Sequence, residues 1–270
     1  MNGFDLTLFA MLLTMHHVLI GGYTGSGKSV LINGIIYTML QHTPHRYKML
    51  LVDPKRVELH RYRKAPHCIG YGDTPETMQA ALQFAVDEME RRYNTMQAAE
   101  IRETAEPDIY IIIDELADLL DVCGKPALQA LKRILQLGRA AHIHIIAATQ
   151  HVSRKTLPTE LQINFPAIVA LPQRSKIESR QMIAEPGAEL LTVGNCLYIT
   201  PQNHDPRRAA IPYIPDTELQ NAVNRWKRPE SKPAQTQTAY QITPDPTPTR
   251  TAAPRKHGIL ARLIKNLLYP

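Results

Sequence analysis

The sequence predicts a three-layer α/β fold in which helices cover both faces of a mainly parallel sheet. Three observations lead to this prediction. Residues 17–20 form a short apolar run before a glycine-rich loop and a helical segment, 30–40. Residues 109–113 are mostly isoleucine, as is typical of a central parallel strand. A third run, 143–148, is also largely apolar and ends in polar residues, and parallel sheets bring such ends to one ligand-binding edge.

The composition is that of a globular protein over most of its 270 residues. Hydrophobic residues make up 44% and charged residues 21%, so the chain can bury a sizeable core. The formal net charge of +6 is compatible with a polyanionic partner but does not require one. The three cysteines form no C-x-x-C pair. This disfavours a disulfide framework or a zinc site and favours a reduced, cytoplasmic setting.

The first segment of the chain, 4–15, is expected to be a short helix that leads into the first strand. It is apolar but contains Asp5, and His16 and His17 follow at once. The run is too short and too interrupted to span a bilayer, and neither a basic region nor a small-residue cleavage site marks a signal peptide.

The glycine-rich loop carries the strongest chemical signal. Residues 22–29, GYTGSGKS, fit the phosphate-binding pattern G-x-x-x-x-G-K-[ST] at every fixed position. The glycines allow a tight turn whose backbone amide groups point at phosphates, Lys28 supplies a mobile charge, and the Ser29 hydroxyl can bind Mg²⁺. The alternative is a chance glycine-rich turn. The expected nucleotide-binding residues are Gly22, Thr24, Gly25, Ser26, Gly27, Lys28, Ser29 and Val30.

A second strand and a long helix are expected next. Residues 47–53 read as a strand, and the charged Asp53 and Lys55 at its end either reach the nucleotide site or pair with each other. Thr74 and Pro75 mark the start of a helix that extends to about residue 99. Its apolar residues recur at helical spacing, which indicates contact with the core.

The strand at 109–113 ends in two acids, Asp114 and Glu115, which is the Walker B arrangement. In this arrangement Asp114 belongs to the Mg²⁺ shell and Glu115 orients the attacking water. The alternative is an unrelated strand that happens to end in acids. Two helices, 116–121 and 127–140, are expected to follow, separated by a break at 122–126. The strand 143–150 ends in Gln150, which either senses the γ-phosphate or caps the strand.

Six phrases of the sequence together resemble the FtsK/SpoIIIE family of DNA translocases. They are HVLIGGYTGSGKS (17–29), VDPKRVEL (52–59), DEMERRY (87–93), IIDELADL (112–119), GRAAHIHIIAATQ (138–150) and SKIESR (175–180). The similarity covers roughly residues 16–215, in the order of the family. The resemblance implies a RecA-like P-loop fold, ATP and Mg²⁺ as cofactors, and a homo-hexamer that moves double-stranded DNA through a central pore.

The resemblance also implies roles for three basic residues. Lys125 falls in the helix break, where relatives place a DNA-facing pore loop, although it is equally compatible with a solvated loop lysine. Arg139 and Arg180 are candidates for an arginine finger that completes the site of a neighbouring subunit. Either arginine can instead make an ordinary ion pair within its own chain.

The sequence departs from the family pattern at several positions. Residues 151–153 replace a proline-rich phrase, and Ala167 stands where many relatives have arginine. Thr192 and Asn195 replace a glycine and an aspartate. Because relatives use these regions for subunit and nucleotide contacts, the departures put coupling between subunits in doubt more than ATP binding.

The domain organisation expected from the sequence is a motor domain, 1–228, a linker, 229–255, and a short helix, 256–270. The linker is rich in Pro, Thr and Gln and is expected to be disordered. The last segment has a basic and an apolar face, so we expect it to dock on a partner protein or on the motor, with binding to a membrane surface less favoured. Larger relatives carry membrane helices and a winged-helix domain, for which this sequence shows no counterpart.

The leading functional hypothesis is an Mg²⁺-dependent ATPase that translocates double-stranded DNA for a plasmid, a phage or another mobile element. One alternative is a protein-export ATPase like those of type VII secretion, which has the same nucleotide chemistry and a different cargo. Another is an assembly subunit that holds nucleotide but hydrolyses it poorly. The intact Lys28, Asp114 and Glu115 argue against this last alternative. The changes at Ala167, Thr192 and Asn195 argue for it.

Overall fold

Eight strands form a single sheet in the computed structural model, which describes residues 4–150 and 157–226. The strands are β1 (His17–Gly21), β2 (Tyr47–Val52), β3 (Cys68–Gly72), β4 (Asp108–Ile113), β5 (Ile143–Thr149), β6 (Ala167–Ala170), β7 (Asn195–Thr200) and β8 (Asn203–Ala210). Their order is β3-β2-β4-β5-β1-β6-β7-β8. All neighbours from β3 to β6 are parallel, whereas β7 and β8 are added antiparallel. The predicted α/β fold with a mainly parallel sheet is confirmed.

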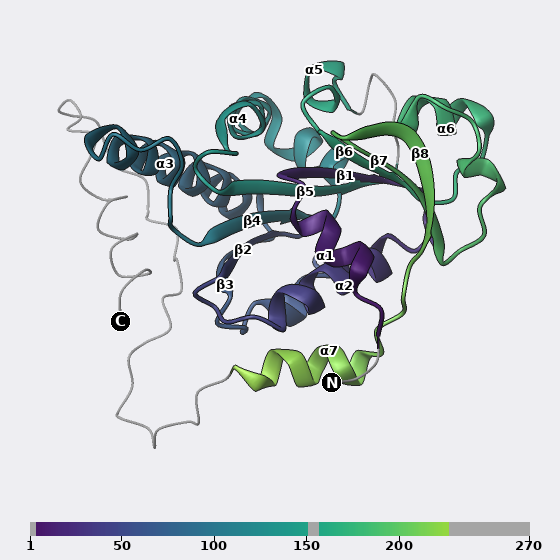
Figure 1. Cartoon of the computed structure of the whole chain (residues 1–270), viewed down its shortest axis with the longest axis horizontal. Helices are drawn as coiled ribbons and strands as arrows, with labels where there is room; N and C mark the ends of the chain where they lie inside the picture. The colour runs from purple at the N-terminus through teal and green to yellow at the C-terminus, as the bar shows by residue number, and fades with distance from the viewer. Residues whose placement is uncertain (1–3, 151–156, 227–270) are drawn as a thin grey trace, which may run out of the picture. The chain divides into compact units, whose positions relative to one another are not determined.

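Helices cover both faces of the sheet (Figure 1). The α-helices are α1 (Thr7–Leu13), α2 (Lys28–Leu40), α3 (Pro75–Ala98), α4 (Leu116–Leu137), α5 (Thr159–Gln162), α6 (Lys176–Ile183) and α7 (Asp216–Arg225), with 3-10 turns η1 (His60–Tyr62) and η2 (Ala188–Leu190). Helices α1, α2 and α7 pack in one hydrophobic cluster, and α3, α4 and α6 pack in the other. Among the described residues, no helix is long and apolar enough to cross a membrane.

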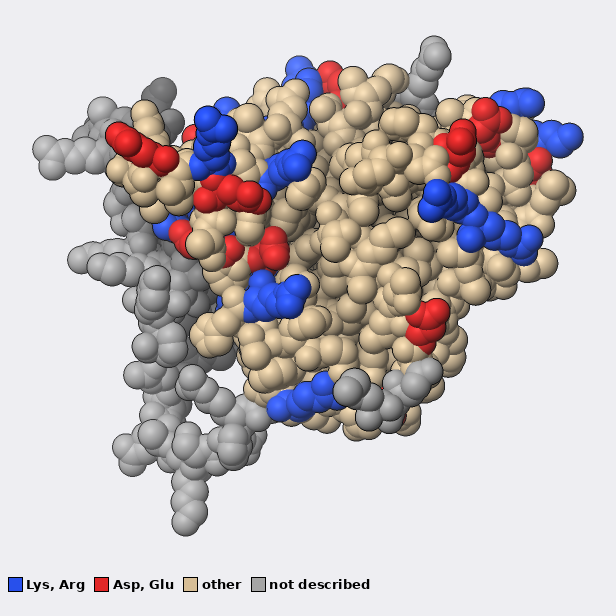
Figure 2. Space-filling model, viewed as in Figure 1, with Lys and Arg blue, Asp and Glu red and all other residues tan. Residues whose placement is uncertain are grey.

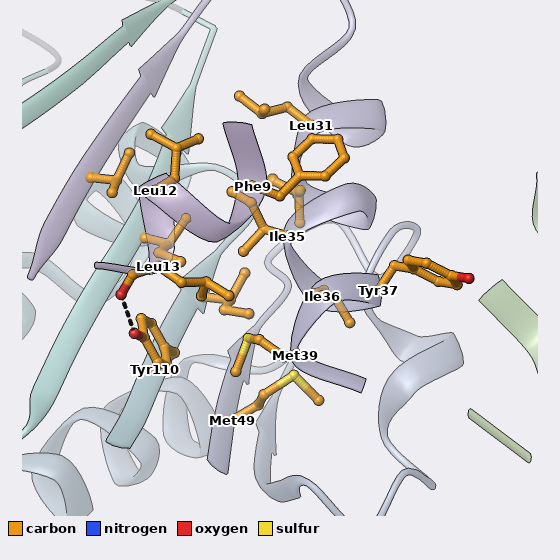
Figure 3. Packing of buried hydrophobic residues seen from close by; sticks show 14 of the residues in the cluster. Phe9, Leu12, Leu13, Leu31, Ile35, Ile36, Tyr37, Met39, Met49 and Tyr110 are labelled. Atoms are coloured by element: carbon orange, nitrogen blue, oxygen red, sulfur yellow. Dashed lines mark hydrogen bonds between the residues drawn. The ribbon is translucent and has the colours of Figure 1, made fainter. Parts of the chain in front are cut away.

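The sequence of the central strand β4 does not alternate between polar and apolar residues. Tyr110 and Ile112 belong to the cluster with α1 and α2, while Ile109, Ile111 and Ile113 belong to the cluster with α3 and α4. Because both faces of the strand are buried, nearly every position is apolar. The Tyr110 hydroxyl donates a hydrogen bond to the carbonyl oxygen of Leu13 at the end of α1 (Figure 3).

Close packing of α1 on α2 explains one glycine. A Cβ atom at Gly34 would lie 2.2 Å from the Phe9 ring, so only glycine allows the ring to sit against the α2 backbone. Phe9 lies among Leu31, Ile35 and their neighbours in the apolar layer between α1 and α2 (Figure 3). The predicted short helix before β1 is therefore part of the core.

The ends of the two long helices follow from local chemistry. Thr74 and Thr77 form a capping box with Pro75 in the first turn, which starts α3 where the sequence predicts it. Helix α4 is broken at Gly124, whose φ of 59° and ψ of −142° are not helical, so the predicted break is confirmed. The second part of α4 ends at Leu137 rather than at residue 140. The chain turns there so tightly that a Cβ atom at Gly138 would lie 2.2 Å from the carbonyl oxygen of Ile143.

Several sequence-based expectations lie outside the described residues. They are the replaced phrase at 151–153, the linker at 229–255 and the helix at 256–270.

Candidate nucleotide-binding and catalytic site

The glycine-rich loop connects the end of β1 to the start of α2 at the carboxyl edge of the parallel strands. Gly25 and Gly27 have φ values of 84° and 103°, which residues with a side chain rarely adopt. Gly27 is the N-cap of α2, and no side chain caps this helix end. The first turn of a helix has amide groups without intrahelical partners, so the loop presents donors to an anion.

Lys28 lies in the first turn of α2 with its ammonium group folded back onto the loop. Nζ donates hydrogen bonds to the carbonyl oxygens of Gly22 at 2.8 Å and Tyr23 at 3.2 Å. Only 8% of the residue is exposed. Burial lowers the pKa of Lys28, while the nearby charges of Glu115 and Asp114 oppose this shift. Lys28 and the two acids therefore lie near one another at the carboxyl edge of the sheet.

Asp114 and Glu115 follow β4 directly and are buried. Strand β5 separates β4 from β1, and because the three strands are parallel their carboxyl ends share one edge. Burial raises the pKa of Asp114 to about 6, with further contributions from Asp53, Glu58 and Glu115. A carboxylate held in such surroundings gains from a cation, because the cation compensates both the burial and the neighbouring negative charges.

The carboxylate of Glu115 is fixed by contacts from two strand ends. The backbone amide of Gln150, just after β5, donates to Oε1 at 3.1 Å and to Oε2 at 3.2 Å. From the other side, Nζ of Lys55, in the loop after β2, lies 3.5 Å from Oε2. The same ammonium lies 3.5 Å from Oδ2 of Asp118 in the first turn of α4.

Gln150 links the acidic strand tip to the glycine-rich loop. Its side-chain Oε1 accepts a hydrogen bond of 2.6 Å from the hydroxyl of Thr24. The backbone amide of Gln150 holds Glu115 at the same time. Gln150 thus contacts both the loop and the acid.

The residues of this edge fit a nucleotide with Mg²⁺. Oγ of Ser26 is buried and has no hydrogen-bond partner among the described residues, so the loop contains a polar position that a ligand can satisfy. Ser29 lies in the first turn of α2 and is half-buried. Within the described ranges, no cluster of three or more His, Cys, Asp or Glu residues forms a metal cage. Mg²⁺ usually takes one or two protein ligands together with phosphate and water, and Ser29 and Asp114 have the oxygen atoms that it prefers.

The prediction that Asp53 and Lys55 pair with each other is wrong. Asp53 accepts hydrogen bonds from the backbone amides of Val57 at 3.3 Å and Leu59 at 3.0 Å, so it shapes its own loop. Lys55 points to Glu115 and Asp118 instead. The other interpretation, that Lys55 reaches the site, agrees with this geometry.

Sequence reasoning missed Gln173. Its side-chain amide donates to the carbonyl oxygens of Gly21 at 3.0 Å and Leu171 at 3.2 Å, which joins the end of β1 to the end of β6 beneath the loop. The guanidinium of the next residue, Arg174, lies 6.0 Å from the centroid of the Tyr23 ring. The available signal was a polar residue directly after an apolar run, the same pattern that identified Gln150.

The three basic candidates are not brought to the loop. Arg139 lies just before β5, at the amino edge of the sheet, where its charge acts on His16. Arg180 is exposed on α6, and Lys125 is exposed beside Gly124 in the break of α4. Among the described residues, no hydrogen bond or ion pair joins the side chains of these three residues to the loop. The arginine-finger role of Arg139 or Arg180 stays a prediction.

The departures from the family pattern fall at both edges of the sheet. Ala167 starts β6 beside Val18, at the amino edge, and is fully buried. Asn195 starts β7 at the opposite edge, and its side-chain amide donates to Oγ1 of Thr192 at 3.1 Å. Thr192 and Asn195 thus stabilise their own turn.

Comparison with known proteins identifies the family. Residues 4–110 match the sequence model of the FtsK/SpoIIIE family. The chain is 40% identical over 232 residues to DNA translocase FtsK of Staphylococcus epidermidis, covering 78% of this chain and 29% of that protein. The chain belongs to the FtsK/SpoIIIE family. DNA translocase FtsK of Listeria monocytogenes is 38% identical over 239 residues, which cover 80% of this chain and 32% of the relative. The chain thus spans less than a third of the length of these FtsK relatives.

Solved structures of similar fold are P-loop ATPases. The pCW3 conjugation coupling protein TcpA, a monomer with ATPγS, superposes with a TM-score of 0.69 at 20% identity, over 80% of this chain and 66% of TcpA. EssC (ATPases 2 and 3) from Geobacillus thermodenitrificans gives a TM-score of 0.69 at 17% identity, over 79% of this chain and 44% of EssC. At these identities the likeness shows the fold. Family and fold together indicate a P-loop ATPase.

Proposed function

We propose that this chain is the motor of an Mg²⁺-dependent ATPase that moves double-stranded DNA. The observation that carries the proposal is the connection of Thr24, Gln150 and Glu115 at one edge of the sheet. This connection joins the phosphate-binding loop to the acid that would activate water. The 37–40% identical relatives named DNA translocase FtsK support duplex DNA as the cargo.

Each residue of the edge has a role that follows from its position. Lys28 and the amide groups of the loop bind the phosphates, because both present positive charge to the same space. Ser29 and Asp114 would hold Mg²⁺, which neutralises charge on the phosphate oxygens when bound. Glu115 is fixed by the Gln150 amide, so its carboxylate can orient and polarise a water molecule.

Gln150 provides a means of coupling. Since its side chain contacts Thr24 and its backbone holds Glu115, a change at the loop is transmitted to the acid through one residue. Lys125 beside the break of α4 would contact DNA phosphates irrespective of sequence. Assembly as a hexamer would allow Arg139 or Arg180 to reach the site of a neighbour, where a guanidinium stabilises developing phosphate charge.

The protein-export alternative is favoured less. The Type VII secretion ATPase EccC of Thermomonospora curvata is 21% identical to this chain, whereas the relatives named DNA translocase FtsK are 37–40% identical. A subunit that holds nucleotide without hydrolysing it is also disfavoured, because Lys28, Asp114 and Glu115 lie together at one edge.

The proposal is tested by the cargo that stimulates ATP hydrolysis. We expect linear duplex DNA, and not an export-substrate peptide, to raise the ATPase rate of the full chain. The Glu115→Gln variant should bind ATP but lower the rate by about 100-fold or more, because general base catalysis contributes on this order. Glu185→Gln, which changes an exposed glutamate outside the site, is the matched control. Stimulation by the peptide alone, or full activity of Glu115→Gln, would refute the proposal.

A further inference from the structure

The loop after β2 holds a lysine at the edge of the site. The Asp53 carboxylate is fully buried and accepts hydrogen bonds from two amides of this loop, at Val57 and Leu59. The amide of Arg56 also donates to the Asp53 carbonyl oxygen at 3.1 Å. The backbone that carries Lys55 is therefore tied at several points, so the direction of its side chain is defined by the fold.

The ammonium group of Lys55 bridges two carboxylates of different exposure. It lies 3.5 Å from Oε2 of Glu115, whose side chain is 3% exposed, and 3.5 Å from Oδ2 of Asp118, whose side chain is 44% exposed. Glu115 is buried and Asp118 is solvated, so the lysine connects the inner acid to an outer anchor on α4. The other contact of the Glu115 carboxylate is the backbone amide of Gln150, which follows β5 on the other side of β4.

We propose that Lys55 is a positioning residue for Glu115, with Asp118 as its outer anchor. The proposal rests on the function proposed above and extends it to the orientation of the water-activating acid. If only the Gln150 amide held the Glu115 carboxylate, the carboxylate could rotate about its last torsion. The second contact, from Lys55 in the loop after β2, fixes the direction of its lone pairs. Water activation depends steeply on such geometry, because a small misplacement of a catalytic group costs much of the rate.

A different result is expected if Lys55 and Glu115 form only a structural ion pair. Partly exposed pairs contribute little to stability, so their loss changes neither the fold nor the chemistry. Direct contact of Lys55 with the nucleotide predicts a third result, because loss of a phosphate contact raises KM. The split between kcat and KM therefore separates positioning from both alternatives.

The test compares Lys55→Met, Lys55→Arg and the control Lys64→Met, an exposed lysine of the same connection between β2 and β3. We expect Lys55→Met to lower kcat by about tenfold or more with KM for ATP changed by less than about twofold. Lys55→Arg should restore part of kcat, and Lys64→Met should behave as the unsubstituted protein. Unchanged or increased kcat in Lys55→Met, or a rise in KM alone, would overturn the proposal.

Asp118→Asn, alone and combined with Lys55→Met, tests the role of Asp118 as the anchor of Lys55. Because Asp118 acts only through Lys55, Asp118→Asn should lower kcat severalfold and should add nothing in the Lys55→Met background. Losses that multiply in the double variant would show that the two residues act independently.

The position of Glu115 can also be followed without turnover. The NMR signal of its side-chain carboxyl carbon, assigned with Glu115→Gln, should move in Lys55→Met and stay in place in Lys64→Met. If the unsubstituted protein does not hydrolyse ATP, the proposed function fails while this signal still decides whether Lys55 orients the acid. If ATP is hydrolysed but DNA does not change the rate, duplex DNA is not the cargo, and the kinetic test of Lys55 remains valid. An unmoved signal in Lys55→Met would contradict the proposal in either case.

Discussion

Asp114 is a carboxylate whose surroundings oppose its own charge. Burial and the acids Asp53, Glu58 and Glu115 raise its pKa to about 6, and the charge of Lys55 compensates in part. Burial likewise lowers the pKa of Lys28. Both groups are held at the edge of the sheet in conditions that favour their neutral forms. Burial therefore opposes the charge of both groups, as is common for ionisable residues at functional sites.

We predict that Asp114→Asn stabilises the nucleotide-free protein. An acid whose pKa is raised in the fold is penalised when ionised, so the penalty is absent below about pH 4 and fully present above about pH 6. At pH 7 the substitution should add on the order of 2–3 kcal/mol to the free energy of unfolding. ATP hydrolysis should be lost at the same time.

Urea unfolding at pH 7 and pH 4 measures this effect. The gain should be present at pH 7 and small at pH 4, and Asp121→Asn, an exposed acid of α4, should change little at either pH. Destabilisation by Asp114→Asn at pH 7 would mean that local contacts favour the ionised form.

The sequence predicted the residues of the site where each follows an apolar run. Asp114, Glu115 and Gln150 stand at strand ends, Lys28 follows the glycine-rich loop after β1, and parallel strands bring their carboxyl ends together. The contact of Lys55 with Glu115 was not predictable in the same way. It depends on β2 lying next to β4, and strand order is set by packing that no local pattern records.

At the scale of single elements, α4 connects the acids to the break at Gly124. The helix begins at Leu116, directly after Glu115, and its first part ends where Gly124 adopts a φ of 59°. Nothing lies within 4 Å of a Cβ built there, so the glycine is required by the backbone conformation and not by crowding. Exposed Lys125 follows at once.

We predict that Gly124→Ala separates DNA stimulation from ATP hydrolysis. Alanine is strained at this φ and ψ by about 1–3 kcal/mol, so the break should be reshaped and Lys125 displaced. Stimulation by duplex DNA should fall while the rate without DNA is retained, because the loop, Asp114 and Glu115 are unchanged. Gln129→Ala, at an exposed position after the break, is the control and should leave both rates intact. Full stimulation by duplex DNA in Gly124→Ala would show that the break in α4 does not contribute to the DNA contact.

The strands differ in how well the sequence predicted them. Strands β1, β2, β4 and β5 are buried on both faces and appear as apolar runs. Strand β8 has the sequence NHDPRRAA and is mostly exposed. It contains Pro206, which a strand tolerates at the edge of a sheet because one side of the strand has no partner. Strand β8 thus carries no apolar signature, and sequence reasoning did not find the antiparallel pair that it forms with β7.

At the scale of the whole molecule, the charges of one face are largely compensated. Figure 2 shows basic and acidic side chains side by side over α3 and α4, and a broad central area without charged residues. Arg91 pairs with Glu88 and Glu106, and Arg133 pairs with Glu90. Among the described residues, the basic side chains over α3 and α4 in Figure 2 are thus interrupted by acidic ones. Lys125, the proposed phosphate contact, is exposed and lies directly after the break of α4.

We propose above that ATP hydrolysis at the carboxyl edge of the sheet moves duplex DNA. Displacement of a third strand from linear duplex DNA by the full chain tests it most directly, because a moving motor removes the strand and a binding protein does not. We predict ATP-dependent displacement by the unsubstituted protein and by Glu185→Gln, and none by Lys28→Ala or Glu115→Gln. Hydrolysis without displacement, or displacement by Glu115→Gln, would contradict the claim.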